Sequence, residues 1–471
     1  MHGLEREGIR VTPDGHLSPT PHPKSLGSSL THPYITTDFA ECQLEFRTLP
    51  EPILDTSLDQ LNQIQSFTAQ RLENELIWPF SMPPRLPEND DDIPLAQYGD
   101  SKLAREKTIY RRGIGHRYGR RIQTVSGVHY NFSLKDSATA QVFQSVADAQ
   151  SFASESDCYF HIVRNLYRRI PFLTYLFGAS PAFDTSYEPT LPQGLMTHKS
   201  DTVYGEFATS IRQSGIGYTS DVQDRLRMSY DSIETFVHDF AWALDTPNPQ
   251  YQQFSVENAQ QLNTNYLQAE QELYAAFRPK QNMESGEKLL DALRNRGVSY
   301  IEFRALDVDP FCPGGVDPQT VAFLQLVILH CLADDSAPLS DEESNSLTAA
   351  NHTVAWRGRE PDLKIPIPGA ESSFHESGRI FCEELQQCAE DLDRSDGSTA
   401  YRDTLKTQIE KWKSPERTPS GKHLAHLLDN DMEFLVLALN LAENYRHHLS
   451  DLKPDTAFQK EIESGTPSQK S

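Results

Sequence analysis

Polar side chains able to bind a metal ion or a phosphate group recur on alternate residues in four short stretches of this chain. The alternating pairs are Glu5 and Glu7, His129 and Asn131, Glu270 and Glu272, and Glu302 and Arg304. Residues two apart on a β-strand point to the same face of a sheet. We therefore expect a sheet with one apolar face and one face of carboxylates, an imidazole and a guanidinium. Such a face suits a hard divalent cation that holds an anionic substrate.

The acidic pair near the start of the chain has two interpretations. Glu5 and Glu7 repel each other on one strand face unless a cation lies between them. An exposed strand edge is the alternative. Asp38 and Glu45 lie in a nearby segment and offer further carboxylate oxygens. Mg²⁺ prefers oxygen ligands of this kind. His129 would add an imidazole, which Mn²⁺ favours more than Mg²⁺, although a single histidine also serves structural roles.

The pair formed by Glu302 and Arg304 is the stronger signal. Both residues fall on the polar face of a strand whose other face carries Ile301, Phe303 and Ala305. A buried ion pair would explain them structurally. In a phosphoryl-transfer site, the glutamate would hold a metal ion and the arginine would neutralise the transferring phosphate.

Residues 101–121 are strongly basic inside an acidic protein. They hold eight lysines and arginines against one acidic residue, Glu106, whereas the whole chain has 43 basic and 67 acidic residues and a net charge of −24. A solvated basic helix face and an anion-binding segment both fit this composition.

The overall composition excludes several classes of protein. A net charge of −24 repels nucleic acid and anionic membranes, and no stretch approaches the ~20 apolar residues of a membrane span. The six cysteines form no C-x-x-C pair, and no apolar leader precedes the first strand, so we expect a reduced, cytoplasmic protein. The sequence also lacks a G-x-x-x-x-G-K-[ST] loop, so phosphate binding would depend on metal and arginine.

The hydrophobic periodicity predicts three regions. Residues 1–335 form a sheet-and-helix core with strands in 1–49, 122–133, 269–274 and 298–307 and helices near 57–77, 157–178 and 317–335. Residues 336–453 form a mainly helical portion packed on this core. The polar residues 454–471 are expected to be a disordered tail.

Several longer motifs, in order along the chain, resemble one known family. They include Gly3-Leu4-Glu5-Arg6-Glu7, Ile35-Thr36-Thr37-Asp38-Phe39, Trp78-Pro79-Phe80-Ser81-Met82-Pro83, Ser126-Gly127-Val128-His129-Tyr130-Asn131, Ala208-Thr209-Ser210-Ile211-Arg212 and Tyr300-Ile301-Glu302-Phe303-Arg304. The chain resembles glutamate–cysteine ligase (γ-glutamylcysteine synthetase) of the bacterial single-chain type. The resemblance covers most of residues 3–320 and weakens after about residue 335.

This resemblance implies an α+β fold of the glutamine-synthetase type, in which a curved antiparallel sheet forms a funnel wrapped by helices. It implies the ATP-dependent ligation of L-glutamate to L-cysteine through a γ-glutamyl phosphate, which is the first step of glutathione synthesis. Mg²⁺ is the implied cofactor, with Mn²⁺ as an alternative, and ATP is a co-substrate. Feedback inhibition by glutathione is a further expectation, and neither nucleic acid nor membrane is an expected partner.

The resemblance also assigns roles to individual residues. The implied metal ligands are Glu5, Glu7, Asp38, Glu45, His129 and Glu302. Arg212 and Arg304 are the implied catalytic residues, which hold the transferring phosphate and the glutamyl group. The implied substrate-binding residues are Phe39, Tyr110, Arg111, Ile114, Gln123, Tyr218 and Tyr274.

Three other functions fit the same residues. A related carboxylate–amine ligase would use another amino acceptor. An inactive homologue would bind ligands without turnover. A metal-dependent phosphatase or nuclease is disfavoured by the acidic composition and by the absence of D-x-D motifs.

Overall fold

A computed structural model describes residues 1–135, 139–188, 192–217, 222–223, 226–284, 286–365 and 373–467. Within these residues, an antiparallel sheet of seven strands has the spatial order β2-β3-β1-β5-β10-β9, and β4 pairs with the end of β1. The strands are β1 (His2–Val11), β2 (Ile35–Thr37), β3 (Gln43–Arg47), β4 (Leu76–Ile77), β5 (Val128–Phe132), β9 (Phe277–Lys280) and β10 (Tyr300–Leu306). The sheet is open, with β2 and β9 at its edges.

One face of this sheet is apolar and is covered by helices. Leu4, Val128, Tyr130, Ile301 and Phe303 are almost fully buried in a hydrophobic core that also contains apolar residues of α1 (Leu54–Ala69), α4 (Glu155–Phe177) and α8 (Pro318–Ala333). Burial of one such side chain contributes roughly 2 kcal/mol. The alternating pattern expected from the sequence is therefore confirmed on the apolar side, and the α+β prediction of an antiparallel sheet wrapped by helices is confirmed with it.

The α4 helix shows why these segments are helical. Ser154 accepts a hydrogen bond from the backbone N–H of Asp157, and the acidic side chains of Glu155 and Asp157 lie in the first turn. Both features stabilise a helix N-terminus. Apolar residues at helical spacing then bury most of its length against β9, β10 and α8, and Gly178 follows its last turn.

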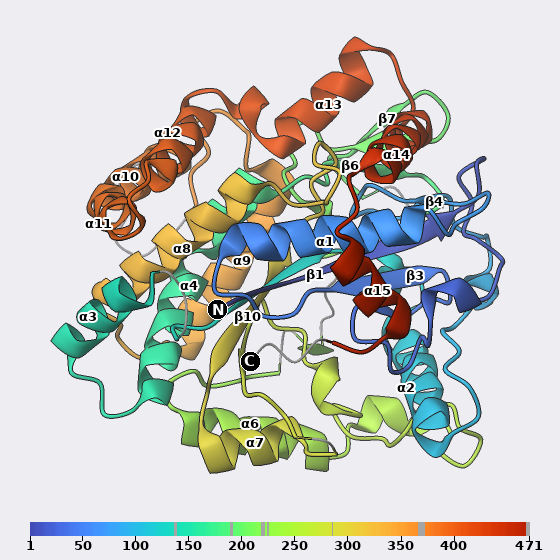
Figure 1. The fold of residues 1–471 in the computed structure, drawn as a ribbon, viewed down its shortest axis with the longest axis horizontal. Coiled ribbons are helices and arrows are strands. Elements are labelled where there is room, and N and C mark those ends of the chain that lie inside the picture. The colour runs from blue at the N-terminus through green and yellow to red at the C-terminus, as the bar shows by residue number, and fades with distance from the viewer. Residues whose placement is uncertain are drawn as a thin grey trace.

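The remaining helices surround this layer (Figure 1). They are α2 (Lys102–Tyr118), α3 (Ala140–Gln150), α6 (Ile233–Asp245), α7 (Leu289–Arg296), α9 (Asp341–Arg357), α10 (Phe374–Glu384), α11 (Gln386–Asp396), α12 (Ala400–Lys413), α13 (Pro419–Asp429), α14 (Phe434–Asp451) and α15 (Thr456–Ser464). A second, three-stranded sheet has the order β6-β8-β7, formed by Ala182–Asp184, Thr202–Tyr204 and Met196–His198. The helices after residue 336 agree with the expected helical portion, and its separation from the core as a domain stays a prediction.

Two expectations about local structure are wrong. Residues Thr456–Ser464 form helix α15, which contacts α1, so the tail is ordered there. His32 Nε2 lies 2.8 Å from the carbonyl oxygen of Ile462, whose side chain is fully buried. Residues Glu270–Glu272 form a 3₁₀ helix rather than a strand.

Candidate active site

Three side chains from three neighbouring strands converge on the open face of the large sheet. Glu5 on β1 pairs in register with His129 on β5, and Glu302 on β10 pairs with Asn131 on β5. His129 Nδ1 lies 3.2 Å from Glu5 Oε2 and 3.7 Å from Glu302 Oε1. One ligand atom from each of Glu5, His129 and Glu302 lies within 4.8 Å of the others, which is a spacing suited to a shared cation.

The charge of Glu302 is stabilised by Arg304 and by two further cations, Lys280 and Arg278, that the sequence analysis did not single out. Burial favours the protonated form of Glu302, but Lys280 and Arg304 outweigh it and hold its pKa well below the usual range. Lys280 Nζ lies 3.4 Å from Glu302 Oε2, and Arg278 Nη1 lies 3.9 Å from the same oxygen. Both residues come from β9, where Pro279 between them obscures the strand signal. Their alternate spacing was the only signal that could have identified them.

Glu5 is also held as a carboxylate. Burial raises its pKa, but the hydrogen bond with His129 works against this, and the pKa of Glu5 is lowered overall. Asn131 Nδ2 donates a 3.0 Å hydrogen bond to Glu5 Oε1. Asn131 therefore orients a proposed metal ligand, as its place on the polar face suggested.

The other three predicted metal ligands lie around this group. Glu7 accepts a 2.8 Å hydrogen bond from the backbone N–H of Gly127, and its Oε1 lies 3.7 Å from His129 Nε2. Burial raises the pKa of Glu7 to about 7. Glu45 pairs in register with Glu7 across β1 and β3, and its carboxylate accepts a hydrogen bond from Thr36 at 2.8 Å.

Asp38 lies at the side of the site that α2 covers. Its backbone oxygen accepts a 2.6 Å hydrogen bond from Arg111 Nε, and its carboxylate lies 3.6 Å from Arg111 Nη2. Glu7, Asp38 and Glu45 are outside the three-residue cluster, and the metal-binding roles of all six residues stay predictions.

The donor set fits a divalent cation. His129 Nε2 is buried and has no hydrogen-bond partner among the described residues. An unpartnered polar atom in the interior costs free energy, which a ligand bound there would recover. Carboxylate oxygens with one imidazole suit Mg²⁺ or Mn²⁺.

The two predicted catalytic arginines meet at the end of this group. Arg304 Nη1 donates a 2.9 Å hydrogen bond to Glu302 Oε1, and Arg212 Nη2 donates a 3.0 Å hydrogen bond to the backbone oxygen of Arg304. Asp307, which the sequence analysis missed, lies 3.8 Å from Arg212 Nη1. Asp307 also accepts hydrogen bonds from Ser180 and Ser210, so it anchors the arginine to a rigid support.

The predicted substrate-binding residues form two groups. The side chains of Gln123 and Tyr274 are hydrogen-bonded to each other at 2.7 and 3.0 Å. Phe39, Tyr110 and Ile114 are buried together in a second hydrophobic core. Tyr218 lies outside the described residues. Their contacts with a substrate stay predictions.

Comparisons with known proteins identify the family. The sequence model of the glutamate–cysteine ligase family matches residues 1–354, more than half of the chain. This chain belongs to the glutamate–cysteine ligase family.

Relatives with this name match almost the whole chain. The glutamate–cysteine ligase of Leptospira interrogans is 47% identical over 469 residues, covering 98% of this chain and 90% of the relative. The enzyme of Saccharophagus degradans is 39% identical over 473 residues, covering 98% of this chain and 88% of its own. The crystal structure of the Francisella tularensis glutamate–cysteine ligase in complex with AMP superposes with a TM-score of 0.90 at 32% identity, covering 98% of this chain and 91% of that one.

Most of the arginines in the basic segment, residues 101–121, bind other parts of the protein. These side chains are therefore neither solvated nor free to bind an anion. Arg112, Arg120 and Arg121 donate hydrogen bonds to backbone carbonyl oxygens of other segments. Arg117 forms a fully buried ion pair with Glu272. Arg111 is the basic residue of this segment whose contacts reach the predicted metal ligands, through Asp38. Sequence alone gives no signal for these distant partners.

The acidic pair in the 3₁₀ helix does not face the metal group. Glu270 accepts hydrogen bonds from the backbone N–H groups of Leu289 and Leu290 at the start of α7. Glu272 lies next to Arg117 instead. Both acidic residues therefore have structural roles. The prediction that residues 269–274 form a fourth strand with a polar face is wrong.

None of the described helices combines the length and apolar composition that a membrane crossing requires.

Proposed function

We propose that this member of the glutamate–cysteine ligase family joins the γ-carboxylate of L-glutamate to the amine of L-cysteine, with ATP converted to ADP and phosphate. The observation that carries this proposal is the convergence of Glu5, His129 and Glu302 beside Arg304, in a chain of this family. The AMP complex of the Francisella enzyme supports a nucleotide as ligand. The reaction is the first step of glutathione synthesis.

The proposed cation site uses Glu5, Glu7, His129 and Glu302, with Asp38 and Glu45 completing the set. The side chains present fit Mg²⁺, and Mn²⁺ would suit the imidazole. When bound, the ion neutralises phosphate oxygens of ATP.

The chemistry needs activation of a carboxylate. Hydroxide is a poor leaving group, so an amine does not displace it directly. The γ-carboxylate of glutamate attacks the γ-phosphorus of ATP, ADP leaves, and an acyl phosphate forms. The amine of cysteine then attacks the acyl carbon, the C–O bond to phosphate breaks, inorganic phosphate leaves and the amine loses a proton.

The arginines supply the charge that this sequence of steps requires. Arg304 and Arg212 are held by Glu302, Asp307 and backbone atoms, so their guanidinium groups are oriented before substrates bind. Preorganised donors stabilise the charge that develops on phosphate oxygens. Positioning of three substrates supplies much of the remaining rate enhancement.

We propose that the amino-acid substrates contact the remaining predicted residues. These are Phe39, Tyr110, Arg111, Ile114, Gln123, Tyr218 and Tyr274. Feedback inhibition by glutathione belongs to the same proposal. So does a cytoplasmic location, which the six free cysteines support.

One assay tests the function. Purified protein with Mg²⁺ and ATP should release ADP only when glutamate and cysteine are both present, and mass spectrometry should identify γ-glutamylcysteine. A different acceptor in the product would favour a related carboxylate–amine ligase. Nucleotide binding without any ADP release would favour an inactive homologue.

A further inference from the structure

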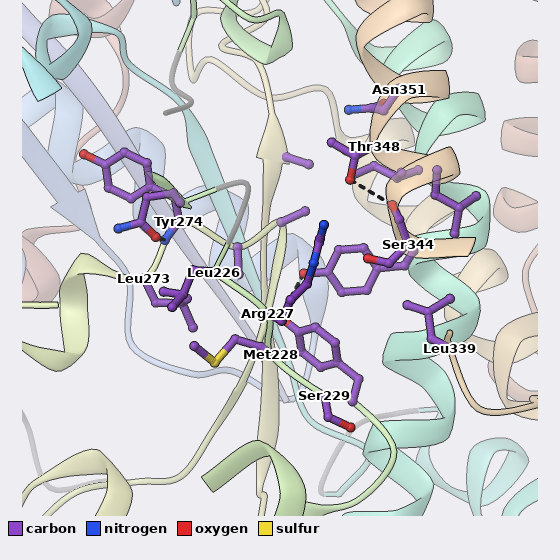
Figure 2. A pocket seen from close by; sticks show the side chains of 18 of the residues that line it. Leu226, Arg227, Met228, Ser229, Leu273, Tyr274, Leu339, Ser344, Thr348 and Asn351 are labelled. Carbon is purple, nitrogen blue, oxygen red and sulfur yellow. Dashed lines mark hydrogen bonds between the residues drawn. The ribbon is translucent and has the colours of Figure 1, made fainter. Parts of the chain in front are cut away.

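Two cavities of very different size lie on opposite sides of the large sheet. The first, of about 610 Å³, belongs to the active site, because it extends from Arg212 and Arg304 to the polar side chains of Ser344 and Thr348 on α9 (Figure 2). The second, of about 20 Å³, lies between β1, β4, α1 and α14, on the face of the sheet that the helices cover. None of the proposed metal ligands or substrate-binding residues lines this second cavity.

Arg6 lines the small cavity from the middle of β1. Its neighbours Glu5 and Glu7 point to the open face of the sheet, because successive residues of a strand point to opposite faces. Arg6 is therefore buried beneath α1 and is only 2% exposed. Its guanidinium group donates hydrogen bonds to Gln65 Oε1 on α1 and, at 3.4 Å, to the backbone oxygen of Trp78.

The charge of Arg6 lacks a carboxylate partner within the part of the chain that the structure describes. Both acceptors of its hydrogen bonds are neutral, and its buried Nε has no hydrogen-bond partner there. Burial lowers the pKa of Arg6 to about 10, and an arginine with this pKa is still protonated at neutral pH. A buried charge without a counter-charge is costly, so an anion bound beside it would recover free energy.

Arg10, on the same face of β1, has the counter-charge that Arg6 lacks. Arg10 is 0% exposed, and its Nη1 lies 2.8 Å from Glu75 Oε2. Glu75 also lines the small cavity, but its carboxylate already accepts hydrogen bonds from Arg10, Ser18 and Thr20. The carboxylate on the wall of the cavity is therefore engaged by the other arginine.

The rest of the wall suits a small and weakly hydrated anion. Arg446, which also lies 3.3 Å from Glu443, brings a second guanidinium group, whereas Tyr445 donates its hydroxyl hydrogen to the backbone oxygen of Pro310. The remaining wall is apolar and consists of Ala69, Leu72, Leu76, Ile77, Pro313, Ala442 and Leu449. A cavity of about 20 Å³ holds roughly one particle the size of a water molecule or slightly larger, which excludes phosphate and sulfate.

We propose that the small cavity binds one monovalent anion, with chloride as the expected ligand, as the counter-ion of Arg6. The inference goes beyond the proposed ligase function and does not depend on it. Because β1 carries Glu5 and Glu7 on its other face, an ion bound to Arg6 would stabilise the strand that presents these proposed metal ligands.

The dependence of stability on chloride tests this site. Urea denaturation is measured over a series of chloride concentrations, with gluconate, which is too large for the cavity, keeping the ionic strength and therefore the screening constant. Above the dissociation constant, each tenfold increase in chloride should lower the unfolding equilibrium constant about tenfold, because one ion binds the folded chain and not the unfolded one. Equal stability of the protein in chloride and in gluconate would overturn the proposal.

A matched pair of variants assigns the effect to Arg6. Arg359 is also largely buried, but its Nε donates to the backbone oxygen of Ala208 and its Nη2 to that of Glu206, and it does not line the cavity. Arg6→Met should abolish the chloride dependence, and Arg359→Met should keep it. The same dependence in both variants, or its loss in both, would overturn the assignment.

Crystals of the unaltered protein grown in bromide provide a test that does not require a variant to fold. Bromide carries the same charge as chloride and scatters anomalously, so a peak in the anomalous map should lie in the small cavity beside the guanidinium group of Arg6. An anomalous map without a peak beside Arg6 would overturn the proposal, whatever the protein does with ATP and amino acids.

Discussion

The ion pair between Arg117 and Glu272 is fully buried and links α2 to the segment that leads to Tyr274. Arg117 Nη1 lies 3.0 Å from Glu272 Oε1, and both side chains are 0% exposed. The other carboxylate oxygen of Glu272 accepts a 2.6 Å hydrogen bond from the backbone N–H of Gln268. Among the described residues, Glu272 is the acidic partner of Arg117.

Glu272→Gln should destabilise the fold markedly. The amide keeps the shape but removes the negative charge, and its NH₂ group opposes the backbone N–H of Gln268. Removing one partner of a buried ion pair costs about 3–5 kcal/mol, because the remaining charge stays buried and uncompensated. Unfolding entropy of about 2 cal/mol/K per residue converts this cost into a fall of roughly 3–5 °C in the midpoint for a chain of 471 residues.

Thermal and urea denaturation would measure the effect, with Glu360→Gln as the matched control. Glu360 pairs with Arg357 at 2.5 Å on the surface, where both side chains are partly exposed. An exposed pair of this kind contributes at most about 1 kcal/mol. If the two variants lost the same stability, the reasoning from burial would be refuted.

The same substitution has a functional readout. Gln223 Nε2 donates to the backbone oxygen of Glu272, and Gln223 Oε1 accepts a 3.2 Å hydrogen bond from the backbone N–H of Tyr274. Glu272→Gln should therefore raise the KM for cysteine more than the KM for ATP. An equal rise in both constants would contradict this positioning role.

Three further predictions concern the site and the core. Glu302→Gln should abolish ADP release and leave the circular dichroism spectrum unchanged; retained turnover would remove Glu302 from the proposed metal ligands. Gly127→Ala places a carbon 2.3 Å from Arg212 Nη2, so the guanidinium group must move and kcat should fall about 10- to 100-fold. Gly215→Ala is the matched control: its added carbon has no described atom within 4 Å, so this variant should stay active. Burial lowers the pKa of His423 from 6.5 to about 4, so this side chain binds a proton more readily in the unfolded chain than in the folded one. The free energy of unfolding should therefore fall by up to ~3 kcal/mol as the pH drops from about 6.5 to 4. His423→Gln should show a weaker pH dependence in urea denaturation, and an unchanged dependence would contradict the role of His423.

Local patterns predicted the strands that carry the site. Residues two apart share a strand face whatever the rest of the chain does, so Glu5 and Glu7 on β1, and Glu302 on β10, were identified without knowledge of the fold. Helices α1, α4 and α8 were predicted for a similar reason, since apolar spacing near 3.6 is a local property.

The same local rules failed where distant partners decide the structure. Alternating acids at Glu270 and Glu272 looked like a strand, but the first binds the start of α7 and the second pairs with Arg117. The polar tail looked disordered, but Tyr34 and His32 provide contacts for α15.

By itself, the sequence determined which face of each strand the candidate metal- and phosphate-binding residues occupy, because side-chain direction follows from the backbone period. Only the tertiary structure decided that β1, β5 and β10 lie side by side in that order, which brings Glu5, His129 and Glu302 together. It also decided that Lys280 joins them and that a cavity opens beyond Arg304. Strand order and cavity shape depend on packing between segments far apart in the chain, which no local pattern records.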